Sequence, residues 1–308
     1  MTQKTPTGPR NKIQSLIKKR MAETPKTEIA ARFVVFDIVI ARINQKEDEF
    51  ASLFGAKLAL KGGYTLIKRL KNIARTTKDL DFVVCLNDKI DGLVEEQMAK
   101  DMISLITGTK SFLDGCDIKM TAVRQYASSP LNGCWNIALD VSCEGKRVGT
   151  SEITIDLSFG DFLDDTAHYL EMADDLKNAY IIPKNSTTRV ISIAQQIGEK
   201  LHALAKKYDD GSENPRTKDL FDIPLFIKSG NVDIIEVAKI TNKIFLYRKP
   251  VSGYDMPDEL PPFPKEWNFY YDKFAKEAGT ELTFKSAEAM VRSLYLEIVS
   301  ILQDEKGK

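Results

Sequence analysis

The 308-residue sequence is poor in the residues on which several common kinds of protein chemistry depend. Its four cysteines are far apart and include no C-x-x-C pair, so a disulfide framework is not expected, and the expected compartment is a reducing cytoplasm. Its two histidines, His168 and His202, are too few for a histidine-rich zinc site or a histidine-based triad. Any catalysis is therefore expected to use carboxylates, lysines, arginines and hydroxyls.

Long apolar runs and net charge are lacking as well. No stretch approaches the ~18 uninterrupted apolar residues of a membrane-spanning helix, and the N-terminal residues are polar and basic, so we expect neither membrane insertion nor secretion. The 44 Lys and Arg residues balance 44 Asp and Glu residues, and zero net charge gives no global field that would steer a polyanion. Nucleic-acid binding would have to come from local segregation of charge.

Charge is segregated along this sequence. Residues 1–27 carry seven basic side chains and one acid, and residues 61–78 carry six basic side chains and no acid. Residues 152–175 carry eight acids and neither Lys nor Arg. A basic arm and a basic loop beside an acidic stretch would suit a polyanionic substrate and its metal ion. Overall neutrality therefore does not argue against RNA.

The hydrophobic spacing changes character near the middle of the sequence. In the first half it predicts a mixed α/β fold, with helices at 27–43, 64–71 and 93–106 and strands at 58–60, 80–86, 118–124, 135–141 and 152–157. In the second half it predicts helices that begin at Ser192 and cover 232–245 and 286–303, with an irregular surface loop over 249–265. We expect a basic N-terminal arm (1–26), an α/β core domain (27–185) and a helical C-terminal domain (186–308).

Two carboxylates two residues apart give the first functional signal. In a strand, Asp79 and Asp81 would point to the same face, where like charges are costly unless a cation lies between them; their hard oxygens suit Mg²⁺. A bare D-x-D is more often a pair of exposed acids at a strand end. Upstream, Gly62-Gly63 between a strand and a helix would offer backbone N–H groups to an anion, although Gly-Gly is more often only a tight turn. Together the two features predict phosphate and metal in one place.

A third carboxylate, Asp156, lies in another β-prone segment. Ile153 and Ile155 alternate with it, so the apolar pair would face the core and Asp156 the opposite face. Asp156 could simply be solvated, but aspartate is depleted inside strands. If neighbouring strands bring it to Asp79 and Asp81, three carboxylates beside a phosphate-binding turn form the arrangement that two-metal phosphoryl or nucleotidyl transfer needs.

The helical half contributes a further group of charged residues. In a helix, Arg216, Asp219 and Asp222 share one face at three-residue steps, either as a salt-bridge ladder or as part of a site. Lys200 interrupts an apolar helix face and could reach a triphosphate as a point charge. On spacing alone, a lysine at the edge of the core explains it nearly as well.

In this order, these segments resemble the abortive-infection nucleotidyltransferase toxins of the AbiEii/AbiGii type. The resemblance rests on four blocks, which are Lys61-Gly62-Gly63 with Arg75-x-Thr77-x-Asp79-Leu80-Asp81-Phe82, Ile153-x-Ile155-Asp156-Leu157-Ser158-Phe159-Gly160-Asp161, Glu199-Lys200-Leu201-x-Ala203-Leu204 and Arg216-x-Lys218-Asp219-Leu220-x-Asp222. It implies a polymerase-β-like nucleotidyltransferase core, with a mixed sheet flanked by helices, and a helical C-terminal domain. It also implies a toxin with a cognate antitoxin that uses Mg²⁺ or Mn²⁺ to transfer a nucleotide from an NTP to an RNA 3′ end, with tRNA as the acceptor.

The resemblance implies roles for individual residues as well. Asp79, Asp81 and Asp156 would hold the metal, and Asp156 would also be the base for the attacking hydroxyl. Lys200 would complete the catalytic group by neutralising the triphosphate. The implied nucleotide-binding residues are Lys61, Gly62, Gly63, Arg75, Thr77, Arg216, Asp219 and Asp222. Broader polymerase-β-like enzymes have Gly-Ser where this sequence has the Gly-Gly of the toxin subfamily, and residues 1–26 and 230–308 show no family signature.

Two other functions are compatible with these residues. The same fold could nucleotidylate a Ser, Thr or Tyr side chain of a protein, as in AMPylation. The chain could also be a catalytically inactive nucleotide-binding module whose helical half docks an antitoxin, although the complete set of carboxylates argues against this. Nothing in the sequence selects the nucleotide or the acceptor.

Overall fold

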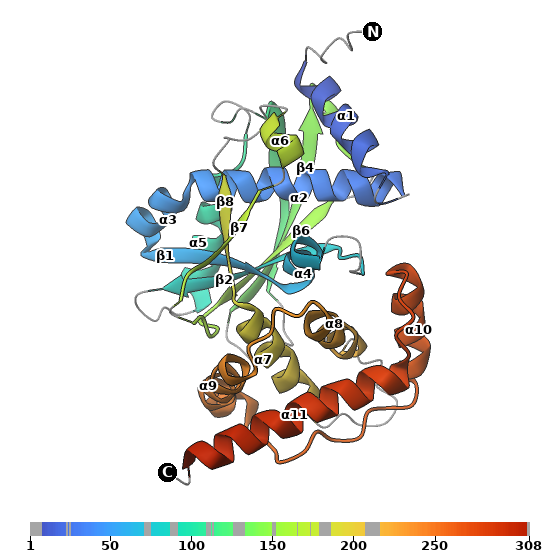
Figure 1. The fold of residues 1–308 in the computed structure, drawn as a ribbon. Helices are drawn as coiled ribbons and strands as arrows, with labels where there is room; N and C mark the ends of the chain where they lie inside the picture. The colour runs from blue at the N-terminus through green and yellow to red at the C-terminus, as the bar shows by residue number, and fades with distance from the viewer. Residues whose placement is uncertain are drawn as a thin grey trace. The chain divides into compact units, whose positions relative to one another are not determined.

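The computed structural model describes residues 8–306 except 23, 25, 71–74, 87–91, 109–111, 113, 126–132, 150–151, 165, 173, 179–185 and 207–215. The chain forms two compact units (Figure 1). The first comprises the chain up to residue 61 together with 78–161 and 168–190, and the second comprises 62–77, 162–167 and the chain from 191 onward. The chain thus passes between the units several times. The domain boundary expected at 185/186 falls at residues outside the described set and stays a prediction, as does the one at 26/27.

The first unit is built on a mixed eight-stranded sheet, which confirms the α/β class. Its strands follow the order β3-β4-β6-β2-β1-β8-β7, and β5 also pairs with β4. The strands are β1 (Ala56–Lys61), β2 (Asp79–Leu86), β3 (Cys116–Gln125), β4 (Cys134–Cys143), β5 (Lys146–Arg147), β6 (Ile153–Phe159), β7 (His168–Glu171) and β8 (Thr187–Val190). The sequence did not predict the short strands β5, β7 and β8.

The central strands of the sheet have one apolar and one polar face. β2 is antiparallel to β1 and parallel to β6, and β6 is antiparallel to β4. Along β6 and β4, buried and half-buried residues alternate strictly, as the sequence predicts for strands with one face in the core. Ile153 and Ile155 are buried, and Asp156 lies on the opposite face. The predicted orientation of Asp156 is therefore confirmed.

The described helices of the first unit are α1 (Pro9–Arg20), α2 (Thr27–Gln45), α3 (Glu47–Phe54), α5 (Gly92–Ser104) and α6 (Asp174–Asn178). Helix α2 is apolar on nearly all sides and buried accordingly, and it lies across the sheet where it contacts β8 (Figure 1). Helix α1 lies within the basic arm and packs against α2, with Ile13, Leu16 and Ile17 buried. Arg20, at its end, pairs with the buried Asp37 of α2 at 2.7 Å.

The second unit is helical, as predicted. Its helices in the described residues are α4 (Gly62–Leu70), α7 (Ile193–Leu204), α8 (Thr217–Lys228), α9 (Ile234–Ser252), α10 (Trp267–Glu277) and α11 (Phe284–Lys306). The side chain of Ser192 caps α7, because its Oγ atom accepts a hydrogen bond from the backbone N–H of Gln195 at 2.9 Å. No helix in the described part of the chain combines the length and apolar character that a membrane crossing needs.

The predicted loop over 249–265 is partly wrong, because α9 continues to Ser252 with Pro250 inside its last turn. The helix ends where Gly253 takes the left-handed conformation (φ 75°), which only glycine adopts without strain. Residues 253–265 are free of helix and strand, so the rest of the prediction holds. Helix α10, which follows, was not predicted.

Candidate active site

Four polar side chains lie side by side on neighbouring strands of the first unit. Lys61, at the end of β1, is directly opposite Asp81 of β2. Asp81 is in turn paired with Asp156 of β6. On the other side of β6, Asp156 is opposite Asn136 of β4. Directly paired residues in a sheet have their Cβ atoms about 5 Å apart and point to the same face. We call these four residues the polar row. The prediction that neighbouring strands bring Asp156 to the D-x-D pair is confirmed.

Hydrogen bonds orient the carboxylates on this face. Asn136 Nδ2 donates to Asp156 Oδ1 at 2.6 Å, and Thr154 Oγ1 donates to Asp79 Oδ1 at 2.8 Å. Asp79 is two residues before Asp81 and level with Thr154, so it shares the face of the polar row. Each bond fixes one carboxylate oxygen and thereby the direction of the other.

The surroundings of Asp156 shift the pKa of its carboxyl group upward. Burial raises the pKa of Asp156 to about 7, and the negative charges of Asp81 and Asp79 act in the same direction. The hydrogen bond from Asn136 and the charge of Lys61 oppose the shift. Asp156 therefore exchanges its proton near neutral pH, which is the range in which a carboxylate can act as a general base.

A raised pKa of this size predicts a pH-dependent gain in stability for Asp156→Asn. An aspartate in the unfolded chain has a pKa of about 3.9. Between pH 3.9 and about 7 the native state therefore binds more protons than the unfolded chain, and its stability falls as the pH rises through this range. Asparagine keeps the shape and the bond to Asn136 but never ionises. We expect the variant to be about 2–4 kcal/mol more stable than the native protein at pH 8 and equally stable near pH 4. Thermal unfolding in EDTA at both values measures this, and no gain at pH 8 would contradict it.

Lys61 makes an ion pair that the sequence did not predict. Its Nζ atom lies 2.8 Å from Oδ2 of Asp161, which follows β6 just after a turn at Gly160. The Asp161 side chain is 1% exposed and that of Lys61 is 12% exposed. In the sequence, Asp161 stood out as part of the acidic stretch and as the last residue of the block that contains Asp156. Nothing there indicated Lys61, 100 positions earlier, as its partner.

The carboxylates have the chemistry of a Mg²⁺ site. They present hard oxygens on one face, and their mutual repulsion is the kind that a divalent cation relieves. Within the described residues, however, no three Asp, Glu, His or Cys side chains are arranged to hold a metal ion together. The donor set therefore fits Mg²⁺ held by one or two protein carboxylates with substrate phosphates completing its shell, which is the usual mode for this ion.

The predicted strand–Gly-Gly–helix turn is present, with α4 starting directly after β1. Gly62 has φ 71°, and its carbonyl accepts hydrogen bonds from Thr65 Oγ1 and Gln196 Nε2, both at 2.7 Å. A Cβ atom on Gly63 would lie 3.0 Å from the Thr77 side chain, so this position has little room for any other residue. The start of α4 presents backbone N–H groups, as an anion-binding turn requires.

A buried charge cluster lies in the second unit. Lys200 Nζ of α7 contacts Asp219 Oδ1 at 2.7 Å and Asp222 Oδ2 at 2.8 Å, both in α8. Arg75 donates two hydrogen bonds to Asp222, at 3.0 and 2.9 Å. Arg216, which is 48% exposed, lies 3.4 Å from Asp219. We call Arg75, Lys200, Asp219 and Asp222 the buried charge cluster.

The pairing in this cluster keeps its lysine charged. Burial lowers the pKa of Lys200, but the charges of Asp219 and Asp222 outweigh it and leave the pKa above its ordinary value. Burial raises the pKa of Asp219, and Lys200 followed by Arg216 outweighs that and leaves the pKa lowered. Of the proposed ladder on α8, the Arg216–Asp219 step is present, whereas Asp222 pairs with Arg75 and Lys200.

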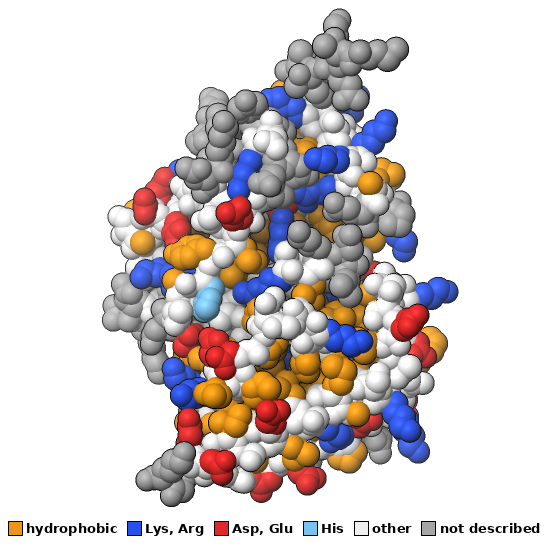
Figure 2. Space-filling model, in the orientation of Figure 1, with side chains coloured by type: hydrophobic (Ala, Val, Ile, Leu, Met, Phe, Trp, Pro, Cys, Tyr) orange, Lys and Arg blue, Asp and Glu red, His pale blue; other side chains and the backbone are white. Residues whose placement is uncertain are grey.

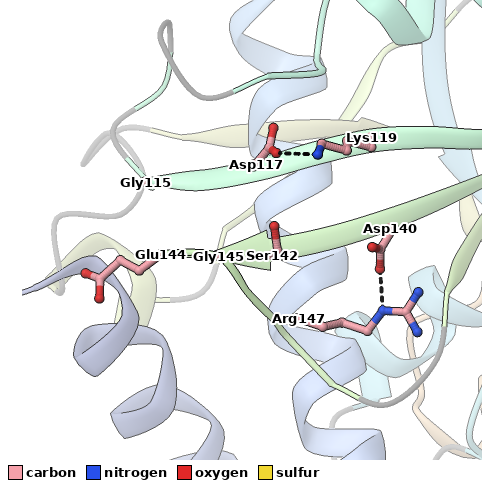
Figure 3. A pocket seen from close by; sticks show the side chains of 8 residues that line it. All are labelled: Gly115, Asp117, Lys119, Asp140, Ser142, Glu144, Gly145 and Arg147. Atoms are coloured by element: carbon pink, nitrogen blue, oxygen red, sulfur yellow. Dashed lines mark hydrogen bonds and ion pairs between the residues drawn. The ribbon is translucent and has the colours of Figure 1, made fainter.

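A shallow pocket of about 630 Å³ lies on the first unit but contains none of the predicted site residues (Figure 3). It is lined by Gly115, Asp117, Lys119, Asp140, Ser142, Glu144, Gly145 and Arg147. Four of its charged side chains form two pairs, Lys119 with Asp117 at 3.4 Å and Arg147 with Asp140. Because the pocket contains none of the predicted site residues, we assign the chemistry to the polar row.

Comparison with solved structures identifies the class of fold. MenT4, a nucleotidyltransferase toxin from Mycobacterium tuberculosis H37Rv, superimposes with a TM-score of 0.55 at 17% identity over 94% of this chain and 89% of that one. An antigenic nucleotidyltransferase-like protein from Paracoccidioides brasiliensis gives a TM-score of 0.38 at 14% identity over 70% of this chain and 90% of that one, which is too low to support a conclusion. The fold is that of a nucleotidyltransferase with a helical C-terminal region.

The family follows from the sequence match. The model described as "Nucleotidyl transferase AbiEii toxin, Type IV TA system" matches residues 48–291. The chain therefore belongs to the AbiEii family, and it is a nucleotidyltransferase toxin of a type IV toxin–antitoxin system. The resemblance inferred from the four blocks is confirmed. No curated protein sequence gives a match.

Proposed function

We propose that this toxin transfers a nucleotide from an NTP to the 3′ end of an RNA, with tRNA as the acceptor, in a reaction that requires Mg²⁺ or Mn²⁺. The observation that carries the proposal is the polar row, in which Asp81 and Asp156 are level on adjacent strands and Asp79 shares their face. Membership of a nucleotidyltransferase family supports an NTP as the substrate. The basic N-terminal helix supports a polyanionic acceptor.

The carboxylates divide into two roles in this proposal. Asp79, Asp81 and Asp156 are the proposed metal ligands, with one or two of them bound to each ion and substrate phosphates completing its shell. Asp156 also takes the proton from the attacking 3′ hydroxyl, whose oxygen then bonds to the α-phosphate of the NTP while pyrophosphate leaves. When bound, Mg²⁺ supplies positive charge to the reacting phosphate oxygens. The rest of the protein's contribution is positioning and neutralisation of charge.

The remaining predicted residues are assigned to nucleotide binding. Gly62 and Gly63 offer the N–H groups at the start of α4 to phosphate oxygens, and Thr77 packs against Gly63 and fixes that turn. Lys61 places a cation at the end of the polar row. The buried charge cluster and Arg216 complete the set, and the charged state of Lys200 supports its assignment to the triphosphate.

Labelling with each of the four NTPs tests the proposal and its competitors together. Purified protein, Mg²⁺ and labelled NTP are incubated with total tRNA and with cell protein, and the two fractions are separated. Label in tRNA is the expected result, and periodate oxidation of the tRNA 3′ end beforehand should prevent it. Label in protein would favour nucleotidylation of a side chain. No label in either fraction, and no rise in melting temperature with any NTP and Mg²⁺, would favour an inactive binding module.

Helix α1 should contribute to RNA binding through charge. It has five Lys and Arg residues and no acid, Lys18 and Lys19 are exposed, and Figure 2 shows blue side chains gathered over α1 and the adjoining part of α2. We expect Lys18→Ala/Lys19→Ala to weaken tRNA binding and to reduce the slope of log K against log salt by about 1–2. Filter binding over a salt series measures both.

Lys239→Ala/Lys243→Ala is the matched control for that prediction. These lysines are also exposed on a helix, but Glu305 and Asp164 lie 3.7 Å from them and balance their charge. The control should bind tRNA with the native affinity and slope. An equal loss of tRNA affinity in the two double variants would show that α1 has no special role in RNA binding.

A further inference from the structure

An exposed arginine on the neighbouring strand lies next to the polar row. Asn136, the last residue of the row, is directly opposite Arg124 of β3, so the two side chains point to the same face of the sheet. The Arg124 side chain is exposed, and β3 is the last strand at this end of the described sheet. Lys61 and Arg124 therefore lie at opposite ends of one line of residues, with the carboxylates between them.

A β-bulge turns Arg124 to this face. The register of β3 against β4 shifts between Met120 and Ala122, because Thr121 is an extra residue between two consecutive pairs. Ile118, before the bulge, is buried, and strict alternation from it would also turn Arg124 to the apolar face. The extra residue turns Arg124 to the polar face instead, and re-aiming a side chain beside an active site is a common role of bulges.

The charge of Arg124 is not balanced by the protein. Two other cations on this face, Lys119 and Arg147, are each paired with an aspartate (Figure 3). Within the described residues, Arg124 has neither an ion pair nor a hydrogen bond. Its neighbour Asn136 is neutral and donates to Asp156. Arg124 thus offers a whole positive charge to a ligand at this end of the polar row.

The position of Arg124 relative to Asp156 indicates which part of a substrate it would meet. Lys61, assigned to nucleotide binding, is at the other end of the row. Asp156, the proposed base for the attacking hydroxyl, is two strands from Arg124, so their Cα atoms are about 10 Å apart. An RNA whose 3′ hydroxyl lies at Asp156 would have its last internucleotide phosphate one ribose away, within reach of the guanidinium.

We propose that Arg124 binds the last internucleotide phosphate of the RNA acceptor and so holds the 3′ hydroxyl at Asp156. The inference rests on the proposed function, which names RNA as the acceptor. A guanidinium presents a planar fork of N–H donors that matches two phosphate oxygens. Contacts to phosphate position a nucleic acid without reading its sequence. Arg124 would therefore select the class of acceptor rather than its sequence.

Steady-state transfer to a short RNA acceptor tests this contact. We expect Arg124→Gln to raise the KM for the acceptor by about tenfold, the scale for a lost hydrogen bond to a charged group. The value of kcat should change by less than about threefold, because the contact is made before and during the reaction alike. Arg124→Lys keeps the charge but loses the fork, so it should restore only part of the affinity. Filter binding of the same RNA without NTP should show the same losses.

A modified acceptor locates the contact on the RNA. Its last internucleotide phosphate is replaced by an uncharged methylphosphonate. The native protein should bind it about tenfold more weakly than the unmodified RNA, whereas Arg124→Gln should bind the two RNAs within about twofold of each other. An equal penalty for the methylphosphonate in both proteins would overturn the assignment.

Lys57→Gln is the matched control. Lys57 is also an exposed strand residue, and it lies on the face of Lys61 but four residues further from the polar row. Within the described part of the chain it has no ion pair either. The control should keep the native KM for the acceptor. A loss equal to that of Arg124→Gln would indicate a general effect of charge and would overturn the inference.

The outcomes separate this inference from the proposed function. If the native protein neither labels nor binds RNA, the RNA acceptor and the role of Arg124 fail together. If it labels RNA and Arg124→Gln keeps the native KM, the role of Arg124 fails alone. If label enters only cell protein and Arg124→Gln lowers it, the contact is with a protein acceptor and the phosphate assignment is wrong.

Discussion

Asp81→Asn is expected to lower nucleotidyl transfer by about 10³-fold, the scale of loss when a group that stabilises charge in the transition state is removed. Asp81 is level with Asp156 and opposite Lys61, so it lies at the centre of the polar row. Asparagine has almost the same shape, and removing one of several like charges relieves repulsion, so the variant should remain folded. Single-turnover labelling of tRNA with saturating NTP and Mg²⁺ measures the loss.

Asp140→Asn is the matched control for Asp81→Asn. Asp140 lies on β4 on the same face as Asn136 but four residues further along, where it pairs with Arg147 outside the polar row. Both of these side chains are partly exposed, so their pair contributes little to stability. The control should transfer nucleotide at the native rate. Native activity in Asp81→Asn would remove the polar row from the mechanism.

The second large effect is expected on stability, from Asp222→Asn. Asp222 is fully buried and accepts hydrogen bonds from Arg75 and Lys200. Removing one partner from a buried group of charges leaves the other partners uncompensated, which costs about 3–5 kcal/mol. Asparagine preserves the volume, so the loss would reflect charge rather than a cavity. Thermal and urea unfolding, followed by circular dichroism of the helical signal, would show it.

Arg216→Ala provides the comparison within the same group of charges. Arg216 is 48% exposed and 3.4 Å from Asp219, and exposed pairs of this kind contribute about 0–1 kcal/mol. We therefore expect the free energy of unfolding of Arg216→Ala to stay close to that of the native protein. Equal destabilisation by Asp222→Asn and Arg216→Ala would mean that the buried charge cluster is not held together by its pairing.

Periodicity in the sequence was enough to predict most of the elements and some of the site. Asp79 and Asp81 share a face because they are two residues apart in a strand, and Asp156 lies opposite the buried Ile153 and Ile155 for the same reason. The Gly-Gly turn was readable because only a few residue types tolerate such a conformation. Short strands such as β7 and β8 were missed because four residues give too little pattern to recognise.

The pairings within the site could not be predicted in this way. Lys61 and Asp161 are 100 positions apart, and Arg75 and Asp222 are 147 positions apart. Spacing on α7 left Lys200 undecided between a core-edge lysine and a phosphate ligand, and it gave no sign of the two carboxylates of α8 that Lys200 contacts. Burial and partners depend on which elements pack together, which no local pattern contains.

Local sequence patterns were enough to establish which residue types are available for chemistry, the faces on which the carboxylates lie and the family that their order resembles. They could do so because these properties depend on neighbours two to four positions away. Packing of the whole chain, by contrast, makes β6 and β2 adjacent and in register, so that Asp156 lies beside Asp81 and the pKa of Asp156 rises to about 7. Strand order and register are set by packing across the whole sheet, and the electrostatics of the site follow from them.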